Sequence, residues 1–283
     1  MTEPAPEDWI GTTRTRADPM DPWAAGALIA TLELDRPAPG PGDPLPPFWH
    51  WMHFLEAAPR SALGPDGHPA TGGFMPRVAQ PRRMWAGGRL RVHAPLPLGT
   101  PATRRETIAD VRRKTGRAGA MTFVTVRHEI AGGAGLAAVE EQDIVYRPDP
   151  DPDAPPRPPE QAPADETDAR AWSCDPTVLF RYSALTFNGH RIHYDLDHAT
   201  RVEGYPGLVV HGPLLATLLL ELAREMGAGR GIAGMAFRAT APVFADEPFE
   251  TCGRPDGGDA LALWVRGADG RLAMRMRVDL APA

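Results

Sequence analysis

Four of the nine histidines fall in one short window of the chain, and their side chains are the ones best suited to acid–base chemistry. They are His190, His193, His198 and His211, and Gly212 follows the last of them. An unperturbed imidazole has a pKa of about 6.5, so it can take up a proton and return it at neutral pH. The window is therefore a candidate site for acid–base chemistry.

A helix is predicted directly after these histidines. Apolar residues recur there at helical spacing, with polar residues on the other face: Leu214, Leu215, Leu218, Leu219, Leu222 and Met226. Pro213 suits the first turn, and Gly227 suits the end. The free N–H groups of a helix N-terminus stabilise developing negative charge, and Gly212 lets a ligand approach the backbone closely.

Strand patterns occupy the rest of both halves. In the second half we predict strands at 235–243, 248–252, 261–266 and 272–280, with a hairpin turn at Ala268-Asp269-Gly270. The first half shows the same run of four, at 89–94, 103–111, 121–128 and 136–146. Its helix is predicted at 21–32, and 46–58 is a helix-like or irregular insertion.

An acidic, proline-rich segment separates the halves. Residues 148–168 hold eight prolines and seven acids against one arginine, which predicts an extended linker. The predicted parts are 1–147, the linker 148–168, and 169–283. Because Ala94-Pro95-Leu96 and Ala241-Pro242-Val243 stand at the same place in each half, we infer an α+β fold of two copies, each a long central helix wrapped by an antiparallel sheet.

Charge and composition exclude several classes of function. The linker alone accounts for the formal net charge of −6, so the remainder is neutral, which argues against a nucleic-acid partner. The longest apolar run, 214–222, is too short to span a bilayer, and the N-terminus has no signal-peptide pattern. Two cysteines cannot form a disulfide framework. We expect a cytoplasmic protein with no membrane partner, and a homodimer is left open.

Three segments together resemble a known family. The stretch Tyr182-Ser-Ala-Leu-Thr-Phe-Asn-Gly-His-Arg-Ile-His-Tyr-Asp195 resembles the active-site motif of the MaoC-like, hotdog-fold enoyl-thioester hydratases. With Arg82-Arg-Met-Trp-Ala-Gly-Gly88 and Glu140-Glu-Gln-Asp-Ile-Val-Tyr146, it is similar to the group of hydroxyacyl-thioester dehydratase type 2 and mesaconyl-C4-CoA hydratase (3-methylfumaryl-CoA hydratase). The resemblance implies a double hotdog fold, an acyl-CoA substrate and no cofactor.

The resemblance also implies roles for single residues. His193 matches the family's catalytic histidine, Asp195 the acid two residues further on, and Gly212 the glycine whose N–H binds the thioester oxygen. The family's catalytic aspartate falls on Asn188, and its asparagine falls on His190. Because an amide cannot exchange a proton, Asn188 is expected to orient water through hydrogen bonds instead.

Arginines near these motifs are candidates for binding the acyl group or CoA. Arg82, Arg83 and Arg89 lie around Trp85 in the first half, and Arg181 and Arg191 flank the histidine motif. Trp85 itself is also a candidate for substrate contact. A guanidinium can hold a carboxylate or phosphate by two parallel hydrogen bonds, although a solvated strand edge is an equal alternative.

The histidines have structural alternatives too. His198 and His211 are residues that a fold often uses to satisfy buried groups, although His190, His211 and Asp195 are also candidates for substrate contact. A metal held by His190 and His193 lacks a third ligand at a recognisable spacing, so no metal is expected.

We therefore expect a hydro-lyase that adds or removes water across the double bond of a short enoyl-CoA thioester, with mesaconyl-C4-CoA as the substrate that the resemblance implies. In this hypothesis His193 activates water, the Gly212 N–H holds the thioester oxygen, and His193 or His190 returns the proton. Three alternatives remain open: a 3-hydroxyacyl-thioester dehydratase of fatty-acid metabolism, a hotdog acyl-CoA thioesterase, and a non-catalytic module that binds acyl thioesters.

Overall fold

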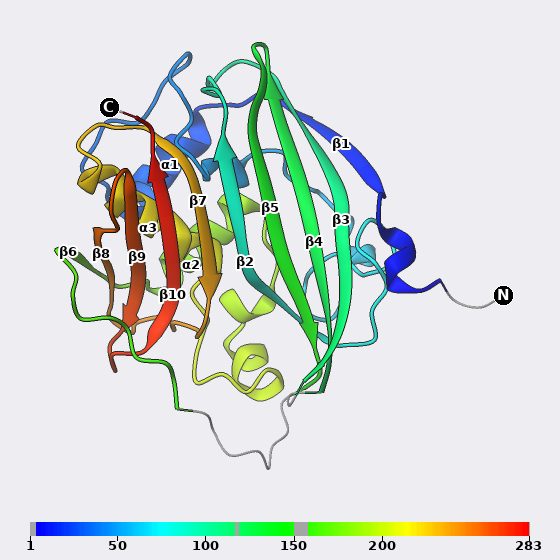
Figure 1. Ribbon diagram of the computed structural model, residues 1–283. Coiled ribbons are helices and arrows are strands. Elements are labelled where there is room, and N and C mark those ends of the chain that lie inside the picture. Colours follow the sequence, from blue (N-terminus) through cyan, green and yellow to red (C-terminus); the bar gives the residue numbers. More distant parts are fainter. Residues whose placement is uncertain (1–3, 117–118, 150–157, 283) are drawn as a thin grey trace.

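The fold is built on one antiparallel sheet, and the computed structural model describes residues 4–116, 119–149 and 158–282. Within these residues ten strands follow the order β1-β3-β4-β5-β2-β7-β10-β9-β8-β6 (Figure 1). The first half contributes β1 (Thr13–Asp18), β2 (Arg82–Val92), β3 (Ala102–Gly116), β4 (Gly119–Gly132) and β5 (Gly135–Arg147). The second contributes β6 (Asp168–Trp172), β7 (Ile232–Ala239), β8 (Phe249–Pro255), β9 (Ala260–Gly267) and β10 (Leu272–Leu280).

The two halves join where β2 pairs with β7. Gly87 lies opposite Arg238 and Gly88 opposite Phe237 in this antiparallel ladder. A Cβ atom at Gly87 would lie 2.6 Å from the Phe237 carbonyl oxygen, and one at Gly88 would lie 2.7 Å from the Glu141 carbonyl oxygen. Side chains are therefore excluded at both positions, and the glycine pair lets the sheet run on without a break.

Three helices lie on the same face of this sheet (Figure 1): α1 (Trp23–Leu32), α2 (Pro176–Thr186) and α3 (Gly212–Met226). The helix predicted after the histidines is confirmed as α3, whose leucines are buried against β8, β9 and β10. The helix predicted at 21–32 is confirmed as α1. It has 10 residues against 15 in α3 and packs on α2, so the two copies are unequal.

Several elements differ from the sequence-based expectation. The eight predicted strands are confirmed, but β2 begins at Arg82, so the glycine-rich stretch before residue 89 is strand. β1, β6 and α2 were not predicted. α2 does carry the start signals of a helix, because Asp175 caps it by accepting from Val178 N and Pro176 occupies its first turn. The insertion at 46–58 is irregular around one 3-10 turn, Trp49–Met52.

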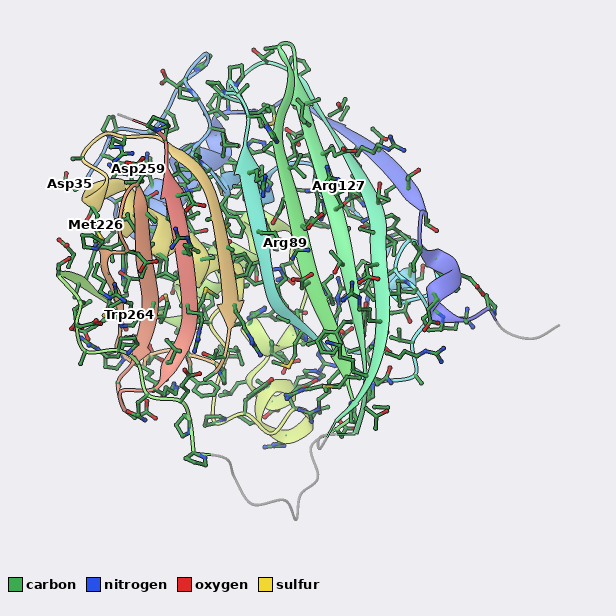
Figure 2. All side chains as sticks on the ribbon, in the orientation of Figure 1. Asp35, Arg89, Arg127, Met226, Asp259 and Trp264 are labelled. Atoms are coloured by element: carbon green, nitrogen blue, oxygen red, sulfur yellow. The ribbon has the colours of Figure 1, made fainter. Side chains whose placement is uncertain are left out.

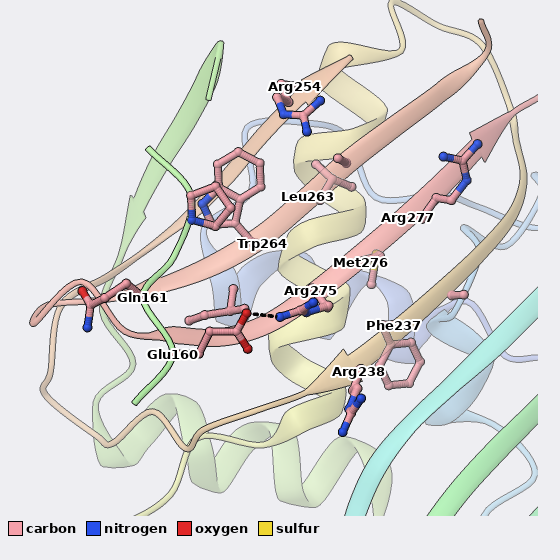
Figure 3. A pocket seen from close by; sticks show the side chains of 14 residues that line it. Glu160, Gln161, Phe237, Arg238, Arg254, Leu263, Trp264, Arg275, Met276 and Arg277 are labelled. Atoms are coloured by element: carbon pink, nitrogen blue, oxygen red, sulfur yellow. Dashed lines mark hydrogen bonds and ion pairs between the residues drawn. The ribbon is translucent and has the colours of Figure 1, made fainter. Parts of the chain in front are cut away.

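The predicted linker is partly attached to the sheet. Residues 150–157 of it lie outside the described residues. Further on, Leu272 N donates to the Glu160 carbonyl at 2.7 Å, and Ala162 packs against Trp264 and Leu272. A shallow groove of about 480 Å³ lies here, with an ion pair between Glu160 and Arg275 (Figure 3). The second part of the linker therefore follows the outer face of the sheet.

Ion pairs cover the outer face of the first half. Arg89 bonds to Glu141 and Asp143, and Arg127 also bonds to Glu141; both arginines are labelled in Figure 2.

Among the described residues, no helix is long and apolar enough to cross a membrane.

Candidate active site

The histidine motif begins where α2 ends. Phe187 closes the helix in the left-handed conformation, with φ of 48°, and the Asn188 N–H donates to the Ser183 carbonyl at 2.8 Å. The Asn188 side-chain oxygen accepts from the His190 N–H at 3.0 Å. Asn188 therefore shapes the loop, and its amide N–H₂ group is what remains for the predicted contact with water.

His193 follows in a short 3-10 turn and points into the protein with 6% of its surface exposed. Its Nδ1 lies 2.7 Å from the Val209 carbonyl oxygen. Because a carbonyl only accepts, Nδ1 carries the proton and Nε2 keeps its lone pair. Burial lowers the pKa of His193 to about 4, although the carbonyl bond opposes this shift. His193 is therefore a neutral base at physiological pH.

The His211 ring stacks on the His193 ring. The two rings stack with centroids 3.6 Å apart and an angle of 17° between their planes. His211 is 0% exposed, and its Nε2 lies 2.8 Å from Ser183 Oγ, which ties the start of α3 to α2. Burial, with the nearby His193 and His190, holds the pKa of His211 well below its usual value. His211 thus supports the His193 ring, while its predicted substrate contact stays a prediction.

Gly212 opens α3, and Trp85 of β2 covers it. A Cβ atom at Gly212 would lie 2.8 Å from Cε3 of Trp85. No described residue accepts a hydrogen bond from the Gly212 N–H, as expected for the first position of a helix. The place where we expect a thioester oxygen is therefore bordered by an indole from the other half of the chain.

A loop of the first half closes on the histidine motif. A Cβ atom at Gly67, whose φ is +89°, would lie 2.0 Å from the Gly189 carbonyl oxygen, so the two backbones touch. The Arg191 N–H donates to the Asp66 carbonyl at 2.9 Å. This contact places the His68 ring 4.5 Å from that of His190.

Four imidazoles thus form a row: His211, His193, His190 and His68. The centroids of the His190 and His193 rings are 5.4 Å apart. We did not predict His68, and the signal in the sequence was a histidine in the turn triplet Asp66-Gly67-His68. Burial, with His193 and Arg83, lowers the pKa of His190 to about 2, and burial with Arg83 holds that of His68 well below its usual value.

Asp66, His68 and His190 are the described side chains that offer metal-ligating groups together. One ligand atom from each lies within 4.8 Å of the others. The trio differs from the pair His190 and His193 weighed from the sequence, since two of its members come from the first half. The Arg83 charge acts on both imidazoles of the trio and opposes a further cation. We therefore assign no metal to this cluster.

The motif's own charges pair with each other. Arg191 donates twice to one Asp195 carboxylate oxygen, at 3.0 and 2.8 Å, and once to the Pro65 carbonyl. The other Asp195 oxygen accepts from the His198 N–H. Arg191 and Asp195 therefore hold the loop in shape, and their predicted substrate contacts stay predictions.

The remaining candidate arginines occupy different settings. Arg82 bonds to Asp149 and Glu203, so its charge is already compensated. Arg181 is exposed on α2. Arg83 is partly buried and acts electrostatically on the pKa values of His68 and His190, which places it beside the row of histidines.

The architecture defines the class of fold. A Mycobacterium tuberculosis protein described as having a double hotdog fold matches with a TM-score of 0.59 and 15% identity, over 96% of each chain. A MaoC-like dehydratase from Phytophthora capsici matches with a TM-score of 0.69 and 13% identity, over 97% of each chain. The predicted double hotdog fold is confirmed.

The family follows from the sequence comparisons. The model for hydroxyacyl-thioester dehydratase type 2 matches residues 48–245, more than half of the chain. The mesaconyl-C(4)-CoA hydratase of Chloroflexus aurantiacus is 49% identical over 275 residues, which are 96% of each protein. The chain belongs to the hydroxyacyl-thioester dehydratase type 2 family, and the predicted resemblance to enoyl-thioester hydratases and dehydratases is confirmed.

Proposed function

We propose that this protein hydrates mesaconyl-C4-CoA (3-methylfumaryl-CoA), a short enoyl thioester, in the cytoplasm and without a cofactor. The observation that carries the proposal is the His193 imidazole, held by Val209 with Nε2 as a free base beside the N-terminus of α3. The 49% identity to a mesaconyl-C(4)-CoA hydratase supports the choice of acyl group.

In the proposed reaction, His193 acts first as a base and then as an acid. Nε2 of His193 takes a proton from water as the water oxygen bonds to Cβ of the substrate. The electron pair of the double bond moves toward the thioester and forms an enolate, whose oxygen accepts from the Gly212 N–H. The imidazolium then returns its proton to Cα. Because burial disfavours the charged ring and holds the pKa of His193 at about 4, this return is favourable.

The neighbouring polar groups orient the water. The Asn188 amide nitrogen can donate to it, since the Asn188 oxygen already accepts from the His190 N–H. A carboxylate at this position would compete for the proton, whereas an amide leaves His193 as the base. The departure from the family's aspartate is therefore compatible with a mechanism that uses a single histidine.

A hydration assay tests the proposal. Purified protein is mixed with mesaconyl-C4-CoA, loss of the enoyl absorbance is followed, and mass spectrometry checks for the gain of one water. Ellman's reagent is added to a parallel sample. Hydration without free thiol is the expected result. Release of thiol would instead identify a thioesterase, and binding with neither change would identify a non-catalytic module.

A 3-hydroxyacyl-thioester dehydratase of fatty-acid metabolism is the second candidate, and the match to the dehydratase family model favours it. The same site would then run in the direction of water loss. A panel of unbranched 2-enoyl-CoA esters of increasing length separates the two candidates. Higher kcat/KM for the longer, uncharged chains would select the dehydratase.

A further inference from the structure

Among the described residues, Arg83 is a charged group without a hydrogen-bond or ion-pair partner. Its side chain makes no hydrogen bond or ion pair with any residue that the structure describes, although it is partly buried. Its neighbour Arg82, by contrast, bonds to Asp149 and Glu203. A partly buried guanidinium with no acceptor among the described residues keeps its donors available for an anionic ligand.

The Tyr146 hydroxyl lies close to Arg83 and also lacks an acceptor. The two residues are directly opposite each other in the β2–β5 ladder, so their side chains share one face of the sheet. Tyr146 is 2% exposed, and no described residue bonds to its hydroxyl. Two hydrogen-bond donors, one of them charged, therefore lie side by side, and neither is bonded to an acceptor among the described residues.

The position of these donors follows from β2. Arg83 stands two residues before Trp85, and residues so spaced lie on the same face of a strand. Trp85 packs against Gly212, where the thioester oxygen is expected. Arg83 also influences His190, whose ring is 5.4 Å from that of His193. Arg83 thus lies near His190, which in turn neighbours the histidine proposed to act at Cβ.

We propose that Arg83 and the Tyr146 hydroxyl bind a carboxylate carried by Cβ of the acyl group, and that they select dicarboxylic over monocarboxylic acyl-CoA esters. The inference rests on the proposed function, in which the carbon that takes up water bears the free carboxylate. The Asp66 carboxylate lies nearby and has the same negative charge as the substrate carboxylate. Its side chain accepts from the His68 N–H. The positive charge of Arg83 must offset the charge of Asp66 before the carboxylate of the substrate can bind beside it.

Two saturated esters test the proposal by binding alone. Succinyl-CoA has a carboxylate on Cβ where butyryl-CoA has a methyl group, and neither has a double bond to hydrate. Calorimetry should show that the native protein binds succinyl-CoA more tightly. Because a hydrogen bond to a charged group is strong, Arg83→Met should weaken succinyl-CoA binding about 10- to 100-fold and change butyryl-CoA binding less than about twofold.

Two further variants keep the test decisive. Tyr146→Phe removes the other donor and should weaken succinyl-CoA binding about 3- to 10-fold, even if Arg83→Met does not fold. Arg82→Met is the matched control, since the same change is made one residue away on an arginine that is already paired. It should leave the preference for succinyl-CoA unchanged.

Equal affinity of the native protein for both esters would overturn the proposal. So would an equal loss for both esters in Arg83→Met, or the same loss in Arg82→Met. The proposed function fails separately, in the hydration assay. A protein that prefers succinyl-CoA through Arg83 but leaves mesaconyl-C4-CoA unchanged would keep the carboxylate site and lose the proposed reaction.

Discussion

Adding one methyl group at Gly212 tests the geometry at the N-terminus of α3. A Cβ atom there would lie 2.8 Å from Trp85 Cε3, whereas ordinary van der Waals contact begins at 3.4 Å, so the indole or the helix must move by about 0.6 Å. Overpacking of this kind costs about 1–3 kcal/mol of unfolding free energy. A shift approaching 1 Å at a reacting group can cost about 10²-fold in rate. We expect Gly212→Ala to lower kcat roughly 10- to 100-fold.

Removing the Trp85 indole tests whether its contact with residue 212 causes the loss of kcat. Trp85→Leu alone should cost about 2–4 kcal/mol in stability. The indole ring packs 4.2 Å from Phe237 and 5.0 Å from Trp51, measured between centroids. In the double variant the new methyl group has room, so Gly212→Ala should cost little further kcat. The four proteins form a double-mutant cycle, with kcat from the enoyl absorbance and stability from chemical denaturation.

The cycle also gives the refuting result. If the logarithms of the two single losses in kcat simply add in the double variant, the indole does not limit the backbone at Gly212. The contact derived from the structure would then have no part in positioning the site. A fully folded Gly212→Ala protein with native kcat would show directly that the contact with Trp85 does not position the site.

The remaining predictions concern the histidine row and the buried charges. His193→Ala should lower kcat by about 10²- to 10⁴-fold, and near-native turnover would remove His193 from the mechanism. Because the pKa of His193 is held at about 4, kcat/KM should stay level from neutral pH downwards and fall only near pH 4; an acid limb near pH 6.5 would contradict this. The same group binds fewer protons folded than unfolded between about pH 6.5 and 4, so unfolding free energy should decrease as the pH falls through that range, as denaturant titrations can measure. Asn188→Asp should fold, since a carboxylate can also accept from His190 N–H, and it should keep measurable hydration; a protein that does not fold would make Asn188 purely structural. Glu140→Gln should cost about 3 kcal/mol, because fully buried Glu140 accepts from Trp51 and lies 2.7 Å from His50 Nε2, and an unchanged denaturation midpoint would refute this.

Local periodicity made the elements of the second half predictable. The α3 leucines and the alternation of β10 are patterns within a few residues, and both elements were located to within two residues of their ends. Helix α2 was not predicted because its last turns, from Tyr182 onward, also belong to the active-site motif and were interpreted as part of it. The motif occupies the end of α2 and the loop after it, so one stretch carries both a helix and the proposed catalytic positions.

The contacts between the halves could not be predicted from local patterns. Gly67 meets Gly189 across more than a hundred residues of chain, and nothing in either loop specifies its partner. His68 therefore remained unnoticed although its residue type was suggestive. Arg82 and Arg83 were equivalent in the sequence, and only their strand positions separate Arg82, which is paired, from Arg83, which has no partner in the part of the chain that the structure describes.

The two halves contribute different parts of the site, which suggests how substrate preference can change while the reaction stays the same. His193, the proposed base, and Gly212 at the N-terminus of α3 come from the second half, whereas Trp85 and Arg83 come from β2 of the first. Strand β2 is fixed to β7 through Gly87 and its neighbour, so the first-half side chains are held at a set depth beside the base. Substitutions on the inner face of β2 can therefore alter which acyl group fits without moving the His193 imidazole, because that ring is held by Val209 and by stacking within its own half.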